Sequence, residues 1–311
     1  MADERPEVFH VLSLDGGGAK GFYTLGVLKE LEAKLGRKIY ESFDLIFGTS
    51  TGAIIAALLA LGHSVDEIKG LYQTHVIKIM ARTFPWQKTA ALEELCREVF
   101  GGKTFEDMKT DVGIVCTNWD SERPMIFKAN VRQAFGRKET FVPGFGVPVG
   151  DAVQASCSAY PFFSRKKVRT SDGVTIELGD GGYCANNPTL YAIADATDAM
   201  KVPRDRIRVL SVGVGEYPAP KKSLLSPLRY AKYIFFARLL QKTLEINTQS
   251  MDQLRRLLFK DIKTVRISKA YTQPEMATDL FEHDIRKLEL LWRRGRDSFG
   301  EFEVELDEFL K

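Results

Sequence analysis

Residues 43–61 read FDLIFGTSTGAIIAALLAL, and this stretch decides the fold. Residues 43–47 form a short, mainly apolar run of strand length, and residues 53–61 are small or aliphatic, as in a buried helix. Between them, Gly48-Thr49-Ser50-Thr51-Gly52 has the pattern G-x-S-x-G. A strand that turns sharply into a helix at this pattern is typical of a nucleophile elbow, which exposes the serine hydroxyl. The pattern alone also suits a turn in which Ser50 only caps the helix.

Apolar runs of strand and helix length alternate along the rest of the chain. This alternation predicts an α/β fold, in which a doubly wound, mostly parallel sheet is flanked by helices in a three-layer α/β/α arrangement. We expect the core at about residues 8–215, with a helical, basic region at about 221–311 packed on it. Strands are predicted at residues 9–14, 43–47, 113–118, 124–129, 175–178, 208–214 and 264–268. Helices are predicted at residues 22–35, 53–61, 66–80, 151–158, 188–200, 223–259 and 279–299.

The composition is that of a protein that folds without disulfides or metals. The chain has 311 residues, 44% of them hydrophobic, and its formal net charge of +3 is too small to indicate a DNA or RNA polymer as partner. The charged start lacks the apolar region of a signal peptide, and the longest apolar run is far shorter than the ~20 residues that span a bilayer. We expect a cytoplasmic protein that contacts the inner face of the membrane peripherally. Four cysteines without a zinc pattern are expected to be reduced thiols: Cys96, Cys116, Cys157 and Cys184.

A glycine-rich loop, Asp15-Gly-Gly-Gly-Ala-Lys-Gly21, joins the first predicted strand to the first helix. The backbone N–H groups of Gly16, Gly17 and Gly18 could hold an oxyanion. Gly16, Gly18 and Gly21 also satisfy the dinucleotide pattern G-x-G-x-x-G, although the next strand runs into residues 48–52 rather than ending on a ribose-binding acid. A plain turn is the third interpretation.

Asp180-Gly181-Gly182 follows the strand predicted at residues 175–178 and supplies a candidate base. A serine nucleophile needs a group that accepts its proton, and histidine is the usual one. The four histidines, however, do not lie beside turns that suggest an active-site loop. A carboxylate can replace histidine if burial raises its pKa above the ordinary value of about 3.9. The histidines are His10, His63, His75 and His283.

The three motifs, taken in this order, resemble those of the patatin-like phospholipase family. That family pairs a loop D-G-G-G-x-[RK]-G with a G-x-S-x-G elbow and a later D-G-[GA]. The supporting positions here are Lys20, Gly21, Gly48, Gly52, Gly181 and Gly182. Further similarities are ASCSAYPFF at residues 155–163, Asn187-Pro188, and LSVGVG at residues 210–215, where Val214 replaces a threonine.

The resemblance implies one patatin-like phospholipase domain over residues 1–311 that hydrolyses fatty-acyl esters, most of all those of membrane phospholipids. It implies that Ser50 attacks the ester carbonyl, that Asp180 takes the serine proton, and that Gly16, Gly17 and Gly18 hold the oxyanion. An acyl-enzyme then forms and water cleaves it. The family uses a Ser–Asp dyad, so no metal or other cofactor is implied.

Within this family, the overall build and the basic C-terminal region resemble the bacterial phospholipase effectors of CBASS antiviral systems. Cyclic oligonucleotides activate those enzymes, which then degrade the cell's own membrane. Two alternatives stay open: a constitutive bacterial lipase or esterase without nucleotide control, and a nucleotide-binding sensor or redox protein that uses residues 16–21. The sequence does not decide whether the chain forms a homo-oligomer.

Two basic segments carry aromatic or aliphatic neighbours. Three interpretations are open for them: a membrane-docking or lid surface, a pocket for an anionic nucleotide activator, or solvated faces of helices that pack on the core. The first segment contains Arg165, Lys166, Lys167 and Arg169 after residues 161–163. The second contains Lys221, Lys222, Arg229, Lys232 and Arg238, interleaved with Leu224, Leu225, Tyr230, Tyr233, Phe235 and Phe236.

Overall fold

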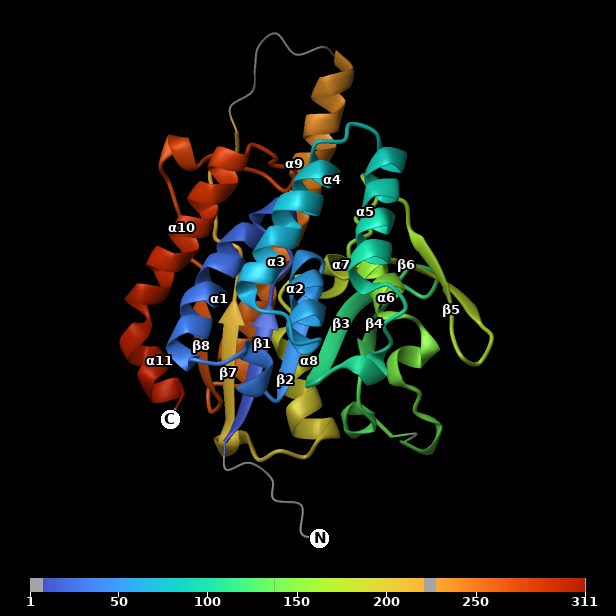
Figure 1. The fold of residues 1–311 in the computed structure, drawn as a ribbon, viewed down its shortest axis with the longest axis vertical. Coiled ribbons are helices and arrows are strands. Elements are labelled where there is room, and N and C mark those ends of the chain that lie inside the picture. Colours follow the sequence, from blue (N-terminus) through green and yellow to red (C-terminus); the bar gives the residue numbers. More distant parts are fainter. Residues whose placement is uncertain (1–7, 137, 221–227, 311) are drawn as a thin grey trace.

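The computed structural model describes residues 8–136, 138–220 and 228–310, with side chains in the helix that begins at residue 228 described from Phe235 onward. Within these ranges, eight strands form one sheet (Figure 1). The strands are β1 (Phe9–Leu14), β2 (Leu45–Thr49), β3 (Asp111–Asn118), β4 (Arg123–Lys128), β5 (Lys166–Arg169), β6 (Thr175–Asp180), β7 (Ile207–Val212) and β8 (Lys263–Ile267).

The order of the strands brings the glycine loop and the serine turn to one edge of the sheet. The order is β5-β6-β3-β2-β1-β7-β8, with β4 also paired to β3. The strands from β3 to β8 in this order are parallel, whereas β4 and β6 are antiparallel to β3 and β5 is antiparallel to β6. Leu14 at the end of β1 lies beside Gly48 of β2 and Val212 of β7. The loops that follow these strands therefore meet, as in other α/β sheets.

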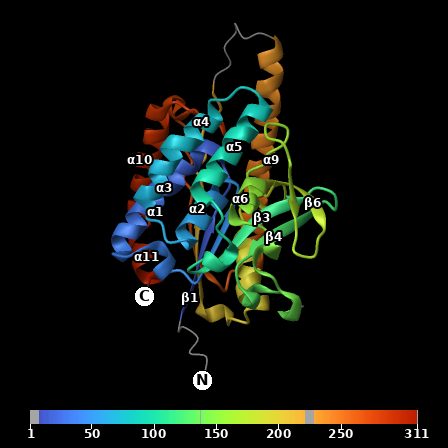
Figure 2. The same cartoon turned by 45° about the vertical axis from the view of Figure 1, so that its right-hand side comes forward.

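Helices cover both faces of the sheet, so the expected α/β/α arrangement is confirmed (Figures 1 and 2). Helices α1 to α6, α10 and α11 pack on the face that holds the larger apolar core, and α7 and α8 pack on the other face. The helices are α1 (Gly21–Leu35), α2 (Thr51–Ala60), α3 (Val65–Leu71), α4 (Ile77–Met80), α5 (Pro85–Phe100), α6 (Val149–Ser156), α7 (Gly182–Ala185), α8 (Thr189–Ala194), α9 (Leu228–Leu258), α10 (Ile285–Glu301) and α11 (Glu303–Phe309).

Helices α1 and α10 approach each other closely because glycines form their contact. A Cβ on Gly26 would overlap the backbone oxygen of Trp292, and a Cβ on Gly295 would overlap that of Tyr23. The C-terminal region is thus packed against the helix that follows the glycine loop.

Several elements differ from the prediction made from the sequence. Helix α5, which begins with Pro85, and the short strand β5 were not predicted. The expected helix at residues 66–80 is divided into α3 and α4 by a wider turn at Tyr72–Val76. Strand β2 runs two residues further than expected, to Thr49, so the elbow begins at Ser50 itself.

The first basic segment belongs to β5 and the residue before it, and two of its cations pair with acids. Arg165 lies 2.9 Å from Glu177, and Lys166 lies 2.8 Å from Asp151. In the second segment, residues 221–227 and the side chains of residues 228–234 lie outside the described part of the chain. Among the helices that the structure describes, none combines the length and the apolar character needed to cross a membrane.

Candidate active site

Ser50 occupies a strained turn between β2 and α2. Its φ of 53° and ψ of −120° lie in a region that non-glycine residues rarely adopt. The side chain of Ser156 holds the turn, because Ser156 Oγ accepts from the Ser50 N–H at 2.9 Å and donates to the Val115 carbonyl. The positions two residues before and two residues after Ser50 both require glycine. A Cβ on Gly48 would overlap the backbone of Gly52, and a Cβ on Gly52 would overlap that of Leu14.

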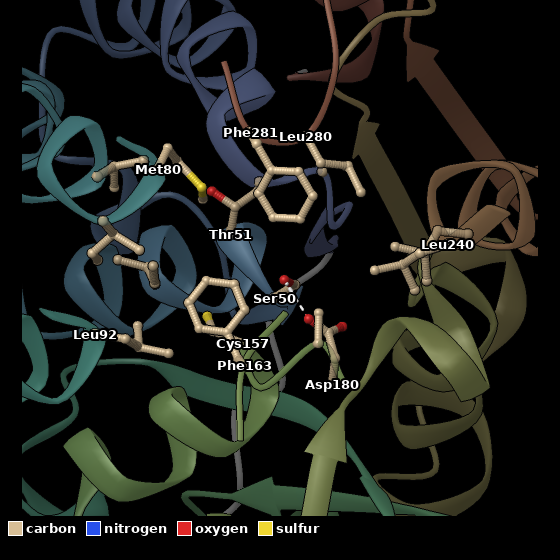
Figure 3. A pocket seen from close by; sticks show the side chains of 17 residues that line it. Ser50, Thr51, Met80, Leu92, Cys157, Phe163, Asp180, Leu240, Leu280 and Phe281 are labelled. Carbon is tan, nitrogen blue, oxygen red and sulfur yellow. Dashed lines mark hydrogen bonds between the residues drawn. The ribbon is translucent and has the colours of Figure 1, made fainter. Parts of the chain in front are cut away.

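Asp180 lies at the end of β6, directly beside Ser50 (Figure 3). Ser50 Oγ donates a hydrogen bond of 2.7 Å to Asp180 Oδ2, and the Gly182 N–H donates one of 2.7 Å to Asp180 Oδ1. Burial raises the pKa of Asp180 to about 7, although both hydrogen bonds act in the opposite direction. A carboxylate with this pKa can accept a proton near neutral pH. The structure therefore brings together the two residues that the sequence motifs predicted as nucleophile and base.

The glycine loop supplies two N–H groups beside Ser50. Gly17 and Gly18 line the pocket in front of Ser50, and no acceptor is found for their N–H groups within the described residues. The Gly16 N–H differs, because it already donates to the Asn186 carbonyl at 2.9 Å. The expectation that all three amides hold an oxyanion is thus narrowed to Gly17 and Gly18. The loop is fixed in place by its neighbour Ala19, whose N–H donates to the Leu280 carbonyl.

Two polar side chains that the sequence analysis did not single out, Arg266 and Asn186, hold this loop. Arg266 of β8 donates to both oxygens of the buried Asp15, and it also donates to Ser211. Asn186 Nδ2 donates to the Gly16 carbonyl at 3.2 Å. Burial raises the pKa of Asp15 above its ordinary value, although the charge and the hydrogen bonds of Arg266 act in the opposite direction. The loop is therefore held in place by Arg266 at Asp15 and by Asn186 at Gly16, without any contribution from a substrate.

Helix α9 is tied to the same loop. Lys20, which is buried, lies 3.3 Å from Glu245 of α9. Asn186 donates through Nδ2 to Thr248 Oγ1, and its N–H donates to Asn247 Oδ1. Lys20 was predicted only as a motif position, and its observed role is to join the loop to α9.

An apolar pocket opens in front of Ser50 and Asp180 (Figure 3). The space between its walls amounts to about 580 Å³, and part of this space is open to solvent. Its walls come from α2, α4, α5, α9 and the segment before α10. Apart from the two glycines, Ser50 and Asp180, the lining residues are Thr51, Ile54, Val76, Ile79, Met80, Leu92, Cys157, Ala159, Phe163, Leu240, Leu244, Leu280 and Phe281.

The pocket and its surroundings favour a lipid chain over a nucleotide cofactor. None of the four histidines is among the residues that line it. Apart from Ser50, Thr51 and Asp180, the side chains that line it are apolar, as a fatty-acyl chain requires. Within the described residues, no group of three or more His, Cys, Asp or Glu side chains could hold a metal ion.

A serine on a strand–helix turn, set in a three-layer α/β/α fold above an apolar pocket, defines a serine acyl hydrolase. The model of the patatin-like phospholipase family matches residues 12–193. The chain belongs to the patatin-like phospholipase family, and it is a hydrolase.

The proteins similar to the chain include two bacterial phospholipases and one protein of known structure. A cUMP-AMP-activated phospholipase of Escherichia coli is 63% identical over 303 residues, which cover 97% of this chain and 94% of that protein. A cGAMP-activated phospholipase of Pseudomonas aeruginosa is 33% identical over 217 residues, covering 66% of this chain and 62% of that protein. The crystal structure of VipD from Legionella pneumophila matches with a TM-score of 0.50 at 14% identity, over 98% of this chain and 67% of that one. The last comparison concerns the fold alone.

Proposed function

We propose that Ser50 and Asp180 form a catalytic dyad that hydrolyses fatty-acyl esters of membrane phospholipids. The observation that carries this proposal is the 2.7 Å hydrogen bond from Ser50 Oγ to Asp180 Oδ2, two residues that line an apolar pocket. The raised pKa of Asp180, about 7, supports its role as the base. The chain as a whole, residues 1–311, acts as one catalytic domain, because α9 and the segment before α10 supply pocket walls.

The reaction proceeds in two halves. As Ser50 Oγ attacks the ester carbonyl, its proton passes to Asp180, and the carbonyl oxygen becomes an oxyanion that the Gly17 and Gly18 N–H groups stabilise. The ester bond then breaks, and the leaving lysophospholipid alcohol takes the proton from Asp180. In the second half, Asp180 removes a proton from water, which attacks the acyl-enzyme. The bond between Ser50 Oγ and the acyl group then breaks, Asp180 returns the proton to Ser50 Oγ, and the fatty acid leaves.

The similar protein of E. coli is named a cUMP-AMP-activated phospholipase, and this likeness supports a regulatory proposal. The present enzyme is activated by a cyclic dinucleotide, with cyclic UMP-AMP as the first candidate. It acts as a CBASS effector in the cytoplasm, at the inner face of the membrane, whose phospholipids it degrades on activation. The 63% identity over nearly the whole chain is the finding that favours this specific activator.

The test is fatty-acid release from phospholipid vesicles, measured with cyclic UMP-AMP, with cyclic GMP-AMP and without nucleotide. We expect release with cyclic UMP-AMP and little without it, and none from Ser50→Ala under any condition. Equal rates in all three conditions would contradict nucleotide control and leave a constitutive lipase. Activity retained by Ser50→Ala would contradict the dyad itself.

A further inference from the structure

One end of the molecule exposes large apolar side chains around the pocket. Phe84 and Trp86 lie at the start of α5, and Phe235, Phe236 and Leu239 lie on α9; together we call these five residues the apolar rim. In both views, the loop between α4 and α5 and the first part of α9 are at the same end of the molecule (Figures 1 and 2). Trp86 is 66% exposed and Phe235 is 62% exposed.

The rim continues the lining of the acyl pocket onto the surface. Met80, four residues before Phe84, lines the pocket, and so does Leu240, one helical turn after Phe236. Figure 3 shows Met80 and Leu240 on opposite sides of Ser50. The parts of the chain that carry the rim therefore also supply pocket walls on both sides of the serine.

The rim side chains are also arranged in pairs. The rings of Phe84 and Trp86 stack with centroids 6.5 Å apart and planes inclined by 11°, and Phe235 meets Phe236 edge to face at 5.7 Å. Single exposed apolar residues are common on protein surfaces, but paired aromatic rings grouped around one opening mark an interaction site.

The two segments that carry the rim hold charges of one sign only. Residues 81–88 and 235–244, which carry all five rim residues, contain no Asp or Glu. Arg82, Arg238 and Lys242 lie in these two segments outside the core. Aromatic rings flanked by Lys and Arg suit the headgroup region of an anionic bilayer. A second copy of the chain fits less well, because a symmetric contact through the rim would set like charges against one another.

We propose that the apolar rim inserts into the anionic surface of a phospholipid bilayer and places the pocket mouth against the lipid. A substrate acyl chain then moves from the bilayer to Ser50 along apolar side chains, without crossing water. This inference rests on the proposed phospholipase function and adds the orientation in which the enzyme meets its substrate.

The experiment compares two substrates and two matched variants of the full chain, with and without cyclic UMP-AMP. The substrates are vesicles of phosphatidylcholine with phosphatidylglycerol, and the soluble ester 4-nitrophenyl butyrate. The test variant is Trp86→Ser with Phe235→Ser, which changes no residue that lines the pocket. The control is Leu257→Ser, which alters a side chain 66% exposed at the far end of α9.

We expect the test variant to bind and hydrolyse vesicles at least about tenfold less well, because two apolar anchors are lost, and to hydrolyse the soluble ester at the wild-type rate. The control variant should match the wild type on both substrates. Tryptophan emission should shift to shorter wavelength when vesicles are added to the wild type, and this shift should be lost in Trp86→Phe.

Three other outcomes would count against one proposal or the other. If the test variant binds and hydrolyses vesicles at the wild-type level, the proposal that the rim inserts into the bilayer is wrong. The proposed phospholipase function would be unaffected. A wild type that hydrolyses neither substrate would contradict the proposed phospholipase function. The vesicle-binding measurement would then still test whether the rim binds the bilayer. If the rim variant changes from dimer to monomer on size exclusion while vesicle binding is unaffected, the rim is an interface between copies and the membrane proposal is wrong.

Discussion

Asn186 and Gly16 are joined by two hydrogen bonds, one from the Gly16 N–H to the Asn186 carbonyl at 2.9 Å and one from Asn186 Nδ2 to the Gly16 carbonyl at 3.2 Å. This pair links the end of α7 to the loop that carries the Gly17 and Gly18 amides. The same side chain holds α9 through Thr248. Asn186 thus positions three elements of the site without lying on the pocket surface.

Replacing Asn186 by Ala should slow catalysis more than it weakens substrate binding. The change leaves the buried Gly16 carbonyl without its side-chain donor and loosens the loop, which lowers the free energy of unfolding by about 1–3 kcal/mol. Steady-state kinetics on a soluble ester should show a lower kcat with a nearly unchanged KM. A variant whose kcat equals that of the wild type would show that the backbone bond alone suffices.

The activity should fall on the acid side of neutrality. Asp180 must be ionised to accept the Ser50 proton, and its pKa is raised to about 7, so the rate should decline as the pH falls through that value. The pH profile of kcat/KM on a soluble ester reports this pKa for the free enzyme. A profile that stays flat down to pH 5 would contradict a carboxyl base with this pKa.

Replacing Asp180 by Asn should abolish activity without weakening the fold. Because the folded-state pKa lies above the ordinary value of 3.8, the native protein between about pH 4 and 7 keeps a proton that the unfolded chain has released. The wild type should therefore lose stability as the pH rises through this window, and the variant should not lose this contribution. Denaturant titrations at several pH values compare the two proteins.

Gly18→Ala should cost about 10²–10³ in rate, through misplacement of an oxyanion donor. The backbone there has a φ of 59°, and an added Cβ would overlap the Leu280 carbonyl. Gly70→Ala in α3 is the matched control, because a Cβ at that position meets no atom within 4 Å. The control should keep full activity and gain about 0.5–1 kcal/mol in the free energy of unfolding. Equal activity of the two variants would exclude the loop from catalysis.

Arg266→Met should be the most damaging change outside the proposed dyad. It would leave the buried Asp15 carboxylate without its partner, which typically costs about 3–5 kcal/mol. Adding Asp15→Asn to the same chain removes the unpaired charge and should restore part of that loss. Chemical denaturation of the single and double variants measures the difference. Equal stability of Arg266→Met and wild type would show that Asp15 is neutral in the folded protein.

The catalytic motifs could be predicted from the sequence because each is local. The elbow at Ser50 and the glycine loop need only a few neighbouring residues to define their backbone geometry, and both follow strands that apolar runs reveal. Asp180 could be chosen over histidine because none of the four histidines follows such a strand. The pairing of Ser50 with Asp180 required the motifs to be combined, since the two residues are 130 positions apart.

The supports of the site could not be predicted, because they depend on distant parts of the chain. Arg266 lies 251 positions from Asp15, and the sequence around neither residue indicates that the two form an ion pair. The engagement of the Gly16 N–H by Asn186 follows from the tertiary arrangement as well. Helix α5 is a different case: after Pro85, apolar residues at Leu92, Leu95 and Phe100 recur at helical spacing and could have revealed it.

The close approach of α1 and α10 sets a lower limit on how far the chain can be shortened for recombinant production. A chain that ended at residue 193, where the family match ends, would lose β7 beside β1 and the α10 backbone that fits against Gly26. The β1 edge and the apolar side of α1 would then face solvent and promote aggregation during expression. Soluble material should require a chain that continues at least through α10, to Glu301.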